Sequence, residues 1–174
     1  YPPGFTEEVR AGAGSYVLDA AQFVAPFDPA TLKNNANLGR LTVTNATGAK
    51  ELDTDAEFER IYVTGGRSFS IRRTNGTLVY DSGDDIEQRT AVLRPDLFNS
   101  QGDASTFDTR SDNKGPEPEG IAIGKVSGRT YAFIGLERIG GVMVYDISKP
   151  TAPKFATYIN TAPTDLSPEG LFFI

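Results

Sequence analysis

Short apolar runs separated by turn-forming residues recur along most of the chain. Between residues 120 and 160 they follow one another as "GIAIGKV", "TYAFIGLE", "GVMVYDI" and "KFATYIN". These runs are rich in Val, Ile, Phe, Tyr and Thr, and the segments between them supply the glycines and prolines that tight turns need. The pattern predicts an up-and-down antiparallel sheet of four strands.

A stiff acidic corner precedes an apolar run twice, as Pro118-Glu119-Gly120 and Pro168-Glu169-Gly170, 50 residues apart. Self-similarity with a period of about 20 to 50 residues is typical of solenoids and propellers. Earlier in the chain, "FERIYVTG" and "GGRSFSIRR" resemble the strands "TYAFIGLE" and "GGVMVYDIS". The sequence therefore predicts an all-β fold, a β-propeller fragment of about two four-stranded antiparallel blades plus the start of a third.

This interpretation divides the chain into five parts. We expect an irregular or partial blade at 1–39, a blade at 40–83, an acidic loop on the top face at 84–118, a blade at 119–160 and the start of the next blade at 161–174. Within the first part, "YVLDAAQF" fits either a strand or a short helix. The segment "DPATLKNNANLG" predicts an Asp-capped helical turn followed by an Asn-rich loop.

Composition narrows the chemistry that the chain can perform. The formal net charge of -6 argues against nucleic-acid and anionic-membrane partners, and no apolar run approaches the ~20 residues that span a bilayer. The absence of histidine excludes imidazole bases and Ser-His-Asp triads. Because cysteine is absent as well, any bound metal must be held by oxygen. Because the chain opens without Met and stops within the apolar run "LFFI", we expect it to be a piece of a longer protein.

Propeller geometry gathers several charged residues at the top face. The segment entering a blade and the turn between its second and third strands lie at the same end, which brings Glu119 and Glu169 to the face that carries Glu137. The candidate metal ligands are Asp84, Asp85, Glu87, Glu119, Glu137 and Glu169. Carboxylates of this kind supply the oxygens that calcium prefers. A solvated acidic turn at "SGDDIEQ", and backbone capping by Glu119 and Glu169, are the alternatives.

Basic residues of the same face are candidates for binding a phosphate. They are Arg67, Arg110, Lys114 and Arg138. Cationic side chains can clamp a phosphate through charge-assisted hydrogen bonds. The alternative is that they pair with neighbouring acids, as the sequence neighbours Glu137 and Arg138 suggest.

The run "GGRSFSI…LVYDSGDDIEQ", continuing into "FDTRSDNKGPEPEGIAIGKVSGRTYAFIGLERIGGVMVYDIS", resembles the choice-of-anchor I family of bacterial surface and secreted proteins. That family is often described as alkaline-phosphatase-like and is similar to the esterase-like phytase propellers. The resemblance implies a β-propeller, an extracellular, periplasmic or cell-surface location, and a calcium-dependent hydrolase acting on a small phosphoester. Classical alkaline phosphatases use a serine nucleophile and zinc held partly by histidine, and this chain matches no such site.

Two hypotheses follow for the intact protein, a calcium-dependent phosphoesterase and a non-enzymatic extracellular module for binding or surface interaction. We expect the 174-residue chain itself to lack a complete active site, because a propeller pocket draws on all its blades. Unpaired blade edges should make the fragment a homo-oligomer. Residues 171–174 are expected to pair with another chain or to lie against "IAIGKV" of their own.

Overall fold

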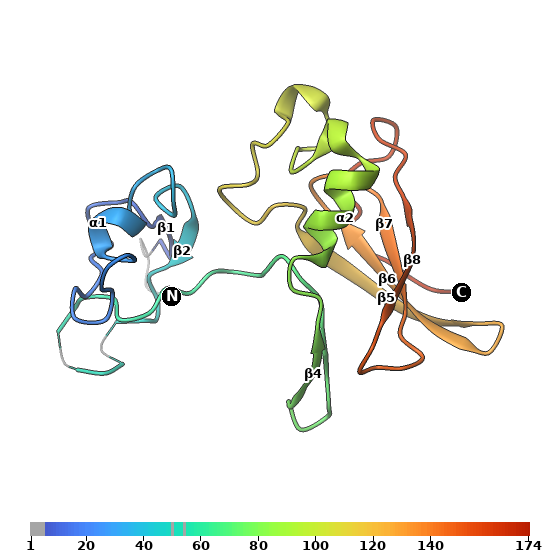
Figure 1. Cartoon of the computed structure of the whole chain (residues 1–174), viewed down its shortest axis with the longest axis horizontal. Coiled ribbons are helices and arrows are strands. Elements are labelled where there is room, and N and C mark those ends of the chain that lie inside the picture. Colours follow the sequence, from blue (N-terminus) through green and yellow to red (C-terminus); the bar gives the residue numbers. More distant parts are fainter. Residues whose placement is uncertain (1–5, 50, 54) are drawn as a thin grey trace. The chain divides into compact units, whose positions relative to one another are not determined.

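The computed structural model describes residues 6–49, 51–53 and 55–174. The chain divides between Thr64 and Gly65 into two compact units (Figure 1). Each unit has its own hydrophobic core. The two units are therefore described separately.

The first unit is built around one small antiparallel sheet. Strand β1 (Glu8–Arg10) pairs with β2 (Thr42–Thr44), and the short helix α1 (Pro29–Leu32) lies between them in sequence. The Asp28 carboxylate accepts a hydrogen bond from the backbone N–H of Thr31 at 3.0 Å. The predicted Asp-capped helical turn is thus confirmed.

Two other predictions for this unit are wrong. The segment "YVLDAAQF" forms neither a strand nor a helix, and "FERIYVTG" contributes only isolated bridges at Phe58. The reason is local. The Phe58 ring stacks on Tyr16 at 4.0 Å between centroids, and the next residue, Glu59, accepts hydrogen bonds from the backbone N–H groups of residues 51–53. Glu59, inside the predicted strand, therefore uses its carboxylate to fix the backbone of residues 51–53.

The second unit contains the four-stranded sheet that the sequence predicts. Its strands β5 (Pro118–Val126), β6 (Arg129–Leu136), β7 (Val142–Asp146) and β8 (Lys154–Ile159) lie side by side in chain order, all antiparallel. A separate hairpin is formed by β3 (Ser70–Arg72) and β4 (Leu78–Asp81). The all-β class is confirmed. Residues 40–83 differ from expectation, because β2 pairs with β1 and the hairpin stands alone. The described residues of this range therefore form no four-stranded sheet.

Segment 84–118 also differs from expectation, because it is not simply a loop. It contains the helix α2 (Asp85–Leu93) and two 3-10 turns, η1 (Pro95–Leu97) and η2 (Ala104–Thr106). Ile86 and Thr90, four residues apart, are both buried on one face of α2. Acidic residues in its first turn suit the positive end of the helix dipole. No helix among the described residues is long and apolar enough to cross a membrane.

The core of the second unit lies between α2 and one face of the sheet. Register pairs Ala132 with Tyr145 and Ile134 with Met143, which places these four buried side chains on the same face. Ile86 of α2 belongs to this cluster. The β3–β4 hairpin packs against the same cluster.

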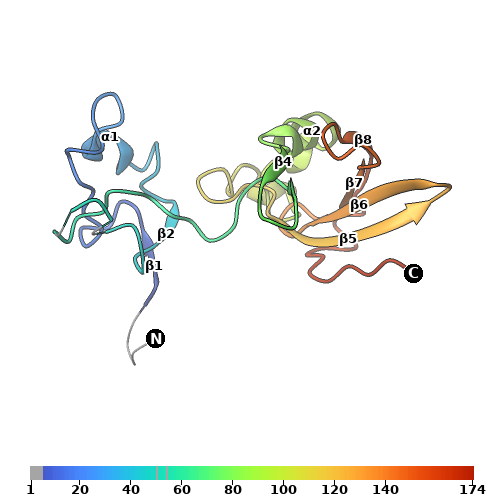
Figure 2. The same ribbon diagram turned by 90° about the horizontal axis from the view of Figure 1, so that it is seen from below.

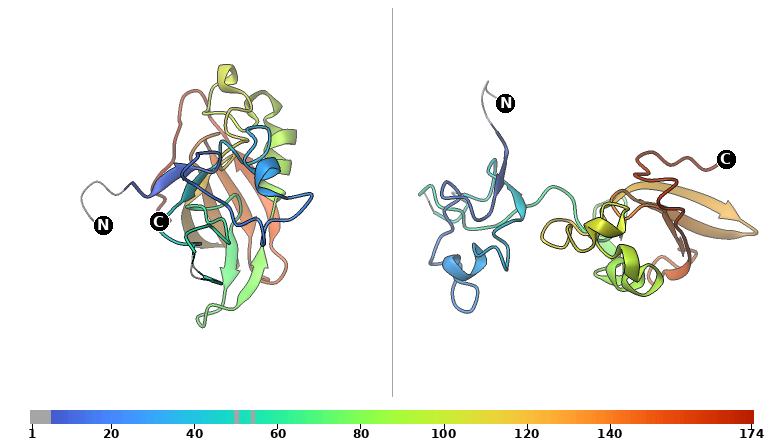
Figure 3. Two further views of the ribbon diagram at one scale, coloured as in Figure 1. Left: turned by 90° about the vertical axis from the view of Figure 1, so that its left-hand side faces the viewer. Right: turned by 90° about the horizontal axis from the view of Figure 1, so that it is seen from above.

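The C-terminal segment covers the other face of the sheet (Figures 2 and 3). The Phe173 ring stacks on Phe133 at 5.4 Å and lies over Gly124, where an added Cβ would come within 2.3 Å of it. Of the two arrangements expected for residues 171–174, the structure shows the second, contact with the chain's own β5. The sheet is therefore flanked by an earlier segment on one face and a later one on the other, as a propeller blade would be.

Candidate functional site

The start of β5 and the end of β6 meet at one end of the sheet, here called the top end. Pro118 is the register partner of Leu136, and the backbone N–H of Glu137 donates to the carbonyl of Glu117 at 2.9 Å. The expected proximity of Glu119 to the turn at Glu137 and Arg138 is a direct result of this antiparallel pairing.

Glu117 is the centre of a buried ion-pair cluster at the top end. Its side chain is only 5% exposed and contacts three cations, Arg110, Lys114 at 3.4 Å and Arg138 at 3.5 Å. Burial acts to raise the pKa of Glu117, but the hydrogen bond from Arg110 and the three positive charges outweigh it. The pKa of Glu117 therefore lies below its usual value, and the carboxylate is ionised.

A second, partly buried network joins Arg67 to Glu87. Their ion pair is 2.7 Å long, and the guanidinium also donates to the backbone carbonyls of Ser111 and Asn113. The buried amide of Asn99 donates to the Glu87 carboxylate and to the Ser111 hydroxyl, both at 2.8 Å. Segment 108–117 is thus held from inside by polar side chains.

Gly115 is required for this close packing. It has a φ of +57°, and a Cβ at this position would lie 2.9 Å from Glu87 Oε1 and 3.0 Å from the Arg67 guanidinium. Any larger residue would push the ion pair apart. The network of Arg67, Glu87 and Asn99 therefore depends on the absence of a side chain at Gly115.

All four candidate phosphate-binding cations lie in ion pairs with carboxylates. Three surround Glu117, and Arg67 pairs with Glu87. Arg138 also contacts Glu137 at 3.0 Å, as the alternative interpretation expects. Each of these cations therefore already has a carboxylate partner within the protein.

Glu119 and Glu137 form a carboxylate pair beside that cluster. Glu119 is exposed, whereas the Glu137 side chain is 15% exposed. The hydrogen bond with Glu119 and burial raise the pKa of Glu137, in spite of the opposing charge of Arg138. Negative charge is thus concentrated where the two carboxylates meet.

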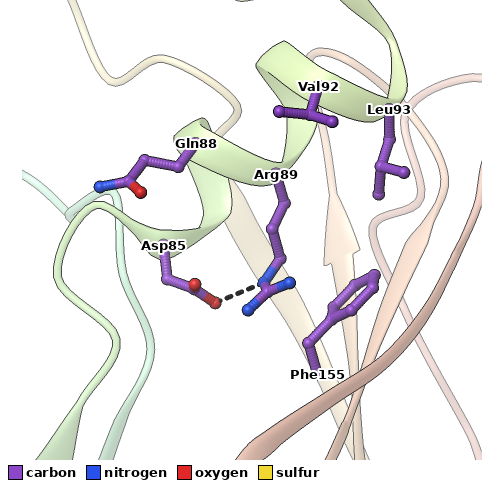
Figure 4. Close-up of a pocket in the computed structure, with 6 residues that line it drawn as sticks. All are labelled: Asp85, Gln88, Arg89, Val92, Leu93 and Phe155. Carbon is purple, nitrogen blue, oxygen red and sulfur yellow. Dashed lines mark hydrogen bonds and ion pairs between the residues drawn. The ribbon is translucent and has the colours of Figure 1, made fainter.

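The acidic candidates at the start of α2 serve the local structure. Asp85 accepts hydrogen bonds from Arg89 at 2.7 Å and from the Tyr145 hydroxyl at 2.6 Å. Figure 4 shows the Asp85–Arg89 pair beside the Phe155 ring. These residues line a pocket of 290 Å³, and the guanidinium carbon of Arg89 lies 4.1 Å from the centre of the Phe155 ring. Asp84 accepts from the Gln88 side chain at 2.8 Å. Asp85 is therefore bound to protein donors on the side facing the sheet.

The residues described do not fit a calcium site by themselves. Within residues 6–49, 51–53 and 55–174, no three acidic side chains lie close enough together to hold a metal. The candidate carboxylates do not gather into one cluster, because Glu87 is bound to Arg67, and Glu169, whose backbone lies against Gly120, is exposed. Calcium takes six to eight oxygen ligands, and the Glu119–Glu137 pair supplies too few.

The sequence interpretation missed the two residues that organise the top end, Glu117 and Asn99. The sequence contains a feature that could have identified Glu117. This residue is the first glutamate of "GPEPEG" and stands between two prolines, after the cations Arg110 and Lys114. No such feature marks Asn99, because its partners become neighbours only when α2 packs against segment 108–117.

Comparisons with known proteins give two kinds of match. A family model described as the choice-of-anchor I domain matches residues 1–150. Gigasin-3a from Magallana gigas is 36% identical over 124 residues, which is 68% of this chain and 43% of that protein. A mesenchyme-specific cell surface glycoprotein from Strongylocentrotus purpuratus is 28% identical over 130 residues, 66% of this chain and 17% of that protein.

The chain thus spans less than half the length of these two relatives. Neither source organism is a bacterium, so these relatives lend no support to the expected bacterial source. No solved structure matches the chain.

Proposed function

The chain belongs to the choice-of-anchor I family, and on this premise we propose that it is part of an extracellular, surface-associated module that acts by binding rather than by catalysis. The location is supported by the family and by the relative that is named a cell surface glycoprotein. The all-β architecture suits such a module, because a rigid sheet can present turns and edges to a partner.

We favour binding over catalysis because the cations of the top end are already engaged by carboxylates of the protein. A phosphoryl-transfer site needs cations whose charge becomes available to the substrate's oxygens. Here Arg110, Lys114 and Arg138 are directed at the buried Glu117. We interpret this cluster as a support for the fold, which fixes the corner from which β5 starts.

Labelling of intact cells tests the location. A membrane-impermeant amine reagent, applied to cells that produce the intact protein, should modify it without permeabilisation. The control is a cytosolic protein of the same cells, which should be labelled only after lysis. Labelling that requires lysis would contradict the proposed extracellular location.

A second candidate function is the calcium-dependent phosphoesterase, acting on a small phosphoester in the intact protein. The Glu119–Glu137 pair favours it, because a cation would relieve the repulsion between two carboxylates. When bound, calcium would polarise a phosphoryl group and favour the ionisation of water. Since the pair supplies too few ligands, this proposal requires further oxygens from other parts of the intact protein.

A phosphatase assay separates the two functions. The intact protein should be incubated with a generic phosphomonoester, first with calcium and then with a chelator. The binding module predicts no turnover above background in either case. Turnover that requires calcium and falls in Glu119→Gln would support the phosphoesterase and contradict the non-enzymatic proposal.

A further inference from the structure

A second group of cations lies at the opposite end of the four-stranded sheet, where β6 begins and β7 ends. A pocket of 350 Å³ opens there, here called the bottom pocket. It is lined by Arg129, Asp146, Ser148, Lys149, Ala152 and Lys154. Three of these residues are basic and one is acidic, in a chain whose net charge is -6.

The cations of the bottom pocket differ from those of the top end in how they are paired. Lys149 and Lys154 are exposed, and no described carboxylate lies within ion-pair distance of either. Arg129 contacts Asp146 at 3.2 Å, but its side chain is 67% exposed. Two of the three cations of the bottom pocket therefore lack a described carboxylate partner, whereas each of the four candidate cations of the top end has one.

The sheet holds the walls of the bottom pocket in place. Asp146 of β7 is the register partner of Lys154 in β8. The backbone N–H of Thr130 donates to the Ser148 hydroxyl at 3.0 Å, and the backbone N–H of Ser148 donates to Asp146 at 2.9 Å. The cations are thus carried by paired strands and a hydrogen-bonded turn rather than by a loose loop.

Asp146 orients Arg129 within this frame. Hydrogen bonds from the hydroxyl and the backbone N–H of Ser148 hold the pKa of Asp146 below its usual value, and the charge of Arg129 acts in the same direction. The carboxylate engages one nitrogen of the Arg129 guanidinium. Since a guanidinium carries five N–H donors, others are left for a ligand.

We propose that the bottom pocket binds an oxyanion group, a sulfate or phosphate carried by a ligand. Two ammonium groups and one oriented guanidinium supply charge-assisted donors for the oxygens of such a group. Three cations against Asp146 leave a positive excess that favours a doubly charged anion. Because these side chains are exposed and screened by water, a single group should bind with a Kd on the order of millimolar.

Titration of the ¹⁵N-labelled chain with inorganic sulfate and with inorganic phosphate at low ionic strength tests this proposal. The amide signals of Arg129, Ser148, Lys149 and Lys154 should shift together and saturate with one Kd. In the double variant Lys149→Ala/Lys154→Ala we expect binding to weaken about tenfold, because two exposed charge contacts are lost. All of the altered side chains are exposed, so the amide spectrum should otherwise remain that of the folded chain.

A matched variant controls for total charge. Arg73→Ala/Lys125→Ala removes the same two charges from exposed side chains of the same unit that do not line the pocket. It should bind sulfate and phosphate as the unaltered chain does. Equal weakening in both double variants, or shifts that never saturate, would overturn the proposal.

Two further ligands distinguish the source of the oxyanion. Glucose 6-phosphate presents the group as a phosphomonoester, and a sulfated oligosaccharide presents it as repeated sulfate esters. Tighter binding of either one, lost in Lys149→Ala/Lys154→Ala, identifies the carrier. If neither binds more tightly than inorganic sulfate and phosphate, the pocket takes only the free ion and the proposal of a carried group is wrong.

Discussion

Glu117 and Glu119 stand two residues apart in the "PEPEG" corner, yet their electrostatic surroundings are opposite. Glu117 is buried among three cations, which favour its ionised form. Glu119 is exposed and faces Glu137, whose pKa it raises. The charge of Glu117 therefore stabilises the fold, whereas the charge of Glu119 adds repulsion at the surface.

Replacement of Glu117 by Gln should strongly destabilise the second unit. The substitution keeps the shape of the side chain but removes the carboxylate that three partly buried cations share, and only Arg138 keeps a second contact, with Glu137. This loss should cost about 3 kcal/mol in the free energy of unfolding. Urea denaturation measures this change. Glu119→Gln is the matched control, and its effect should stay within about 0.5 kcal/mol. Equal effects of the two substitutions would contradict the central role of Glu117.

The same carboxylate should make stability depend on pH. Because the pKa of Glu117 is lower in the folded state than in the unfolded state, its contribution is fully present above the unfolded value of about 4.3. That contribution is lost as the pH falls through the folded value. Thermal unfolding between pH 7 and pH 3 should show this loss in the unaltered chain and a smaller one in Glu117→Gln. Parallel pH profiles would argue against the lowered pKa.

Glu137 should show the opposite dependence. Its folded pKa is raised, so the folded state binds a proton more readily than the unfolded chain, and stability falls as the pH rises through the folded pKa. Glu137→Gln should therefore stabilise the chain at neutral pH by up to about 1 kcal/mol. If the intact protein is the calcium-dependent phosphoesterase of the second proposal, calcium should raise the melting temperature of the unaltered protein but not of Glu119→Gln. A melting temperature that calcium leaves unchanged would mean that the Glu119–Glu137 pair binds no calcium.

At the scale of elements, the four-stranded sheet could be predicted because each strand is marked twice, by β-branched and aromatic residues and by glycine or proline at its ends. Helix α2 was missed for a physical reason. Only Ile86 and Thr90 are buried along it, which is too few to produce a helical period in a polar segment. The pairing of β2 with β1 was missed because strands of three residues, separated by more than 30 positions, carry no register signal.

The candidate site likewise contains some contacts that the sequence could predict and others that it could not. The meeting of Glu119 with Glu137 followed from strand order alone, so the sequence could predict it. The ion pair between Arg67 and Glu87 could not be predicted, since it depends on the packing of α2 against segment 108–117. Sequence patterns thus placed residues at an end of the sheet without showing which of them neutralise each other.

The contact of the C-terminal segment with β5 can be tested at Gly124. Gly124→Ala should push the Phe173 ring away, because the new Cβ would lie 2.3 Å from it, at a cost of about 1 to 3 kcal/mol. Nuclear Overhauser contacts between the Phe133 and Phe173 rings should disappear. Gly66→Ala is the control, since nothing lies within 4 Å of a Cβ at that position. Ring contacts that persist in Gly124→Ala would mean that the segment lies elsewhere in solution.

At the scale of the whole molecule, the sheet of the second unit has two unpaired edges, β5 and β8. Apolar side chains remain uncovered on β5, where Ile121 is 54% and Ile123 is 62% exposed. Phe172 and Ile174 of the C-terminal segment are also exposed. In a longer member of the family, further strands could cover such surfaces.

The chain should therefore associate with itself through the β5 edge. An unpaired strand next to exposed apolar residues favours pairing with a second copy. The net charge of -6 opposes association at low salt, but at physiological ionic strength screening limits repulsion to about 8 Å, so association should increase with salt. Sedimentation at ~100 µM measures it, and Ile123→Lys should shift the chain toward monomer because it places a charge at the contact. Ile159→Lys, an equally exposed position on β8, is the control. A monodisperse monomer at all salt concentrations would mean that the sheet protects its own edges, and loss of association only in Ile159→Lys would move the contact to β8.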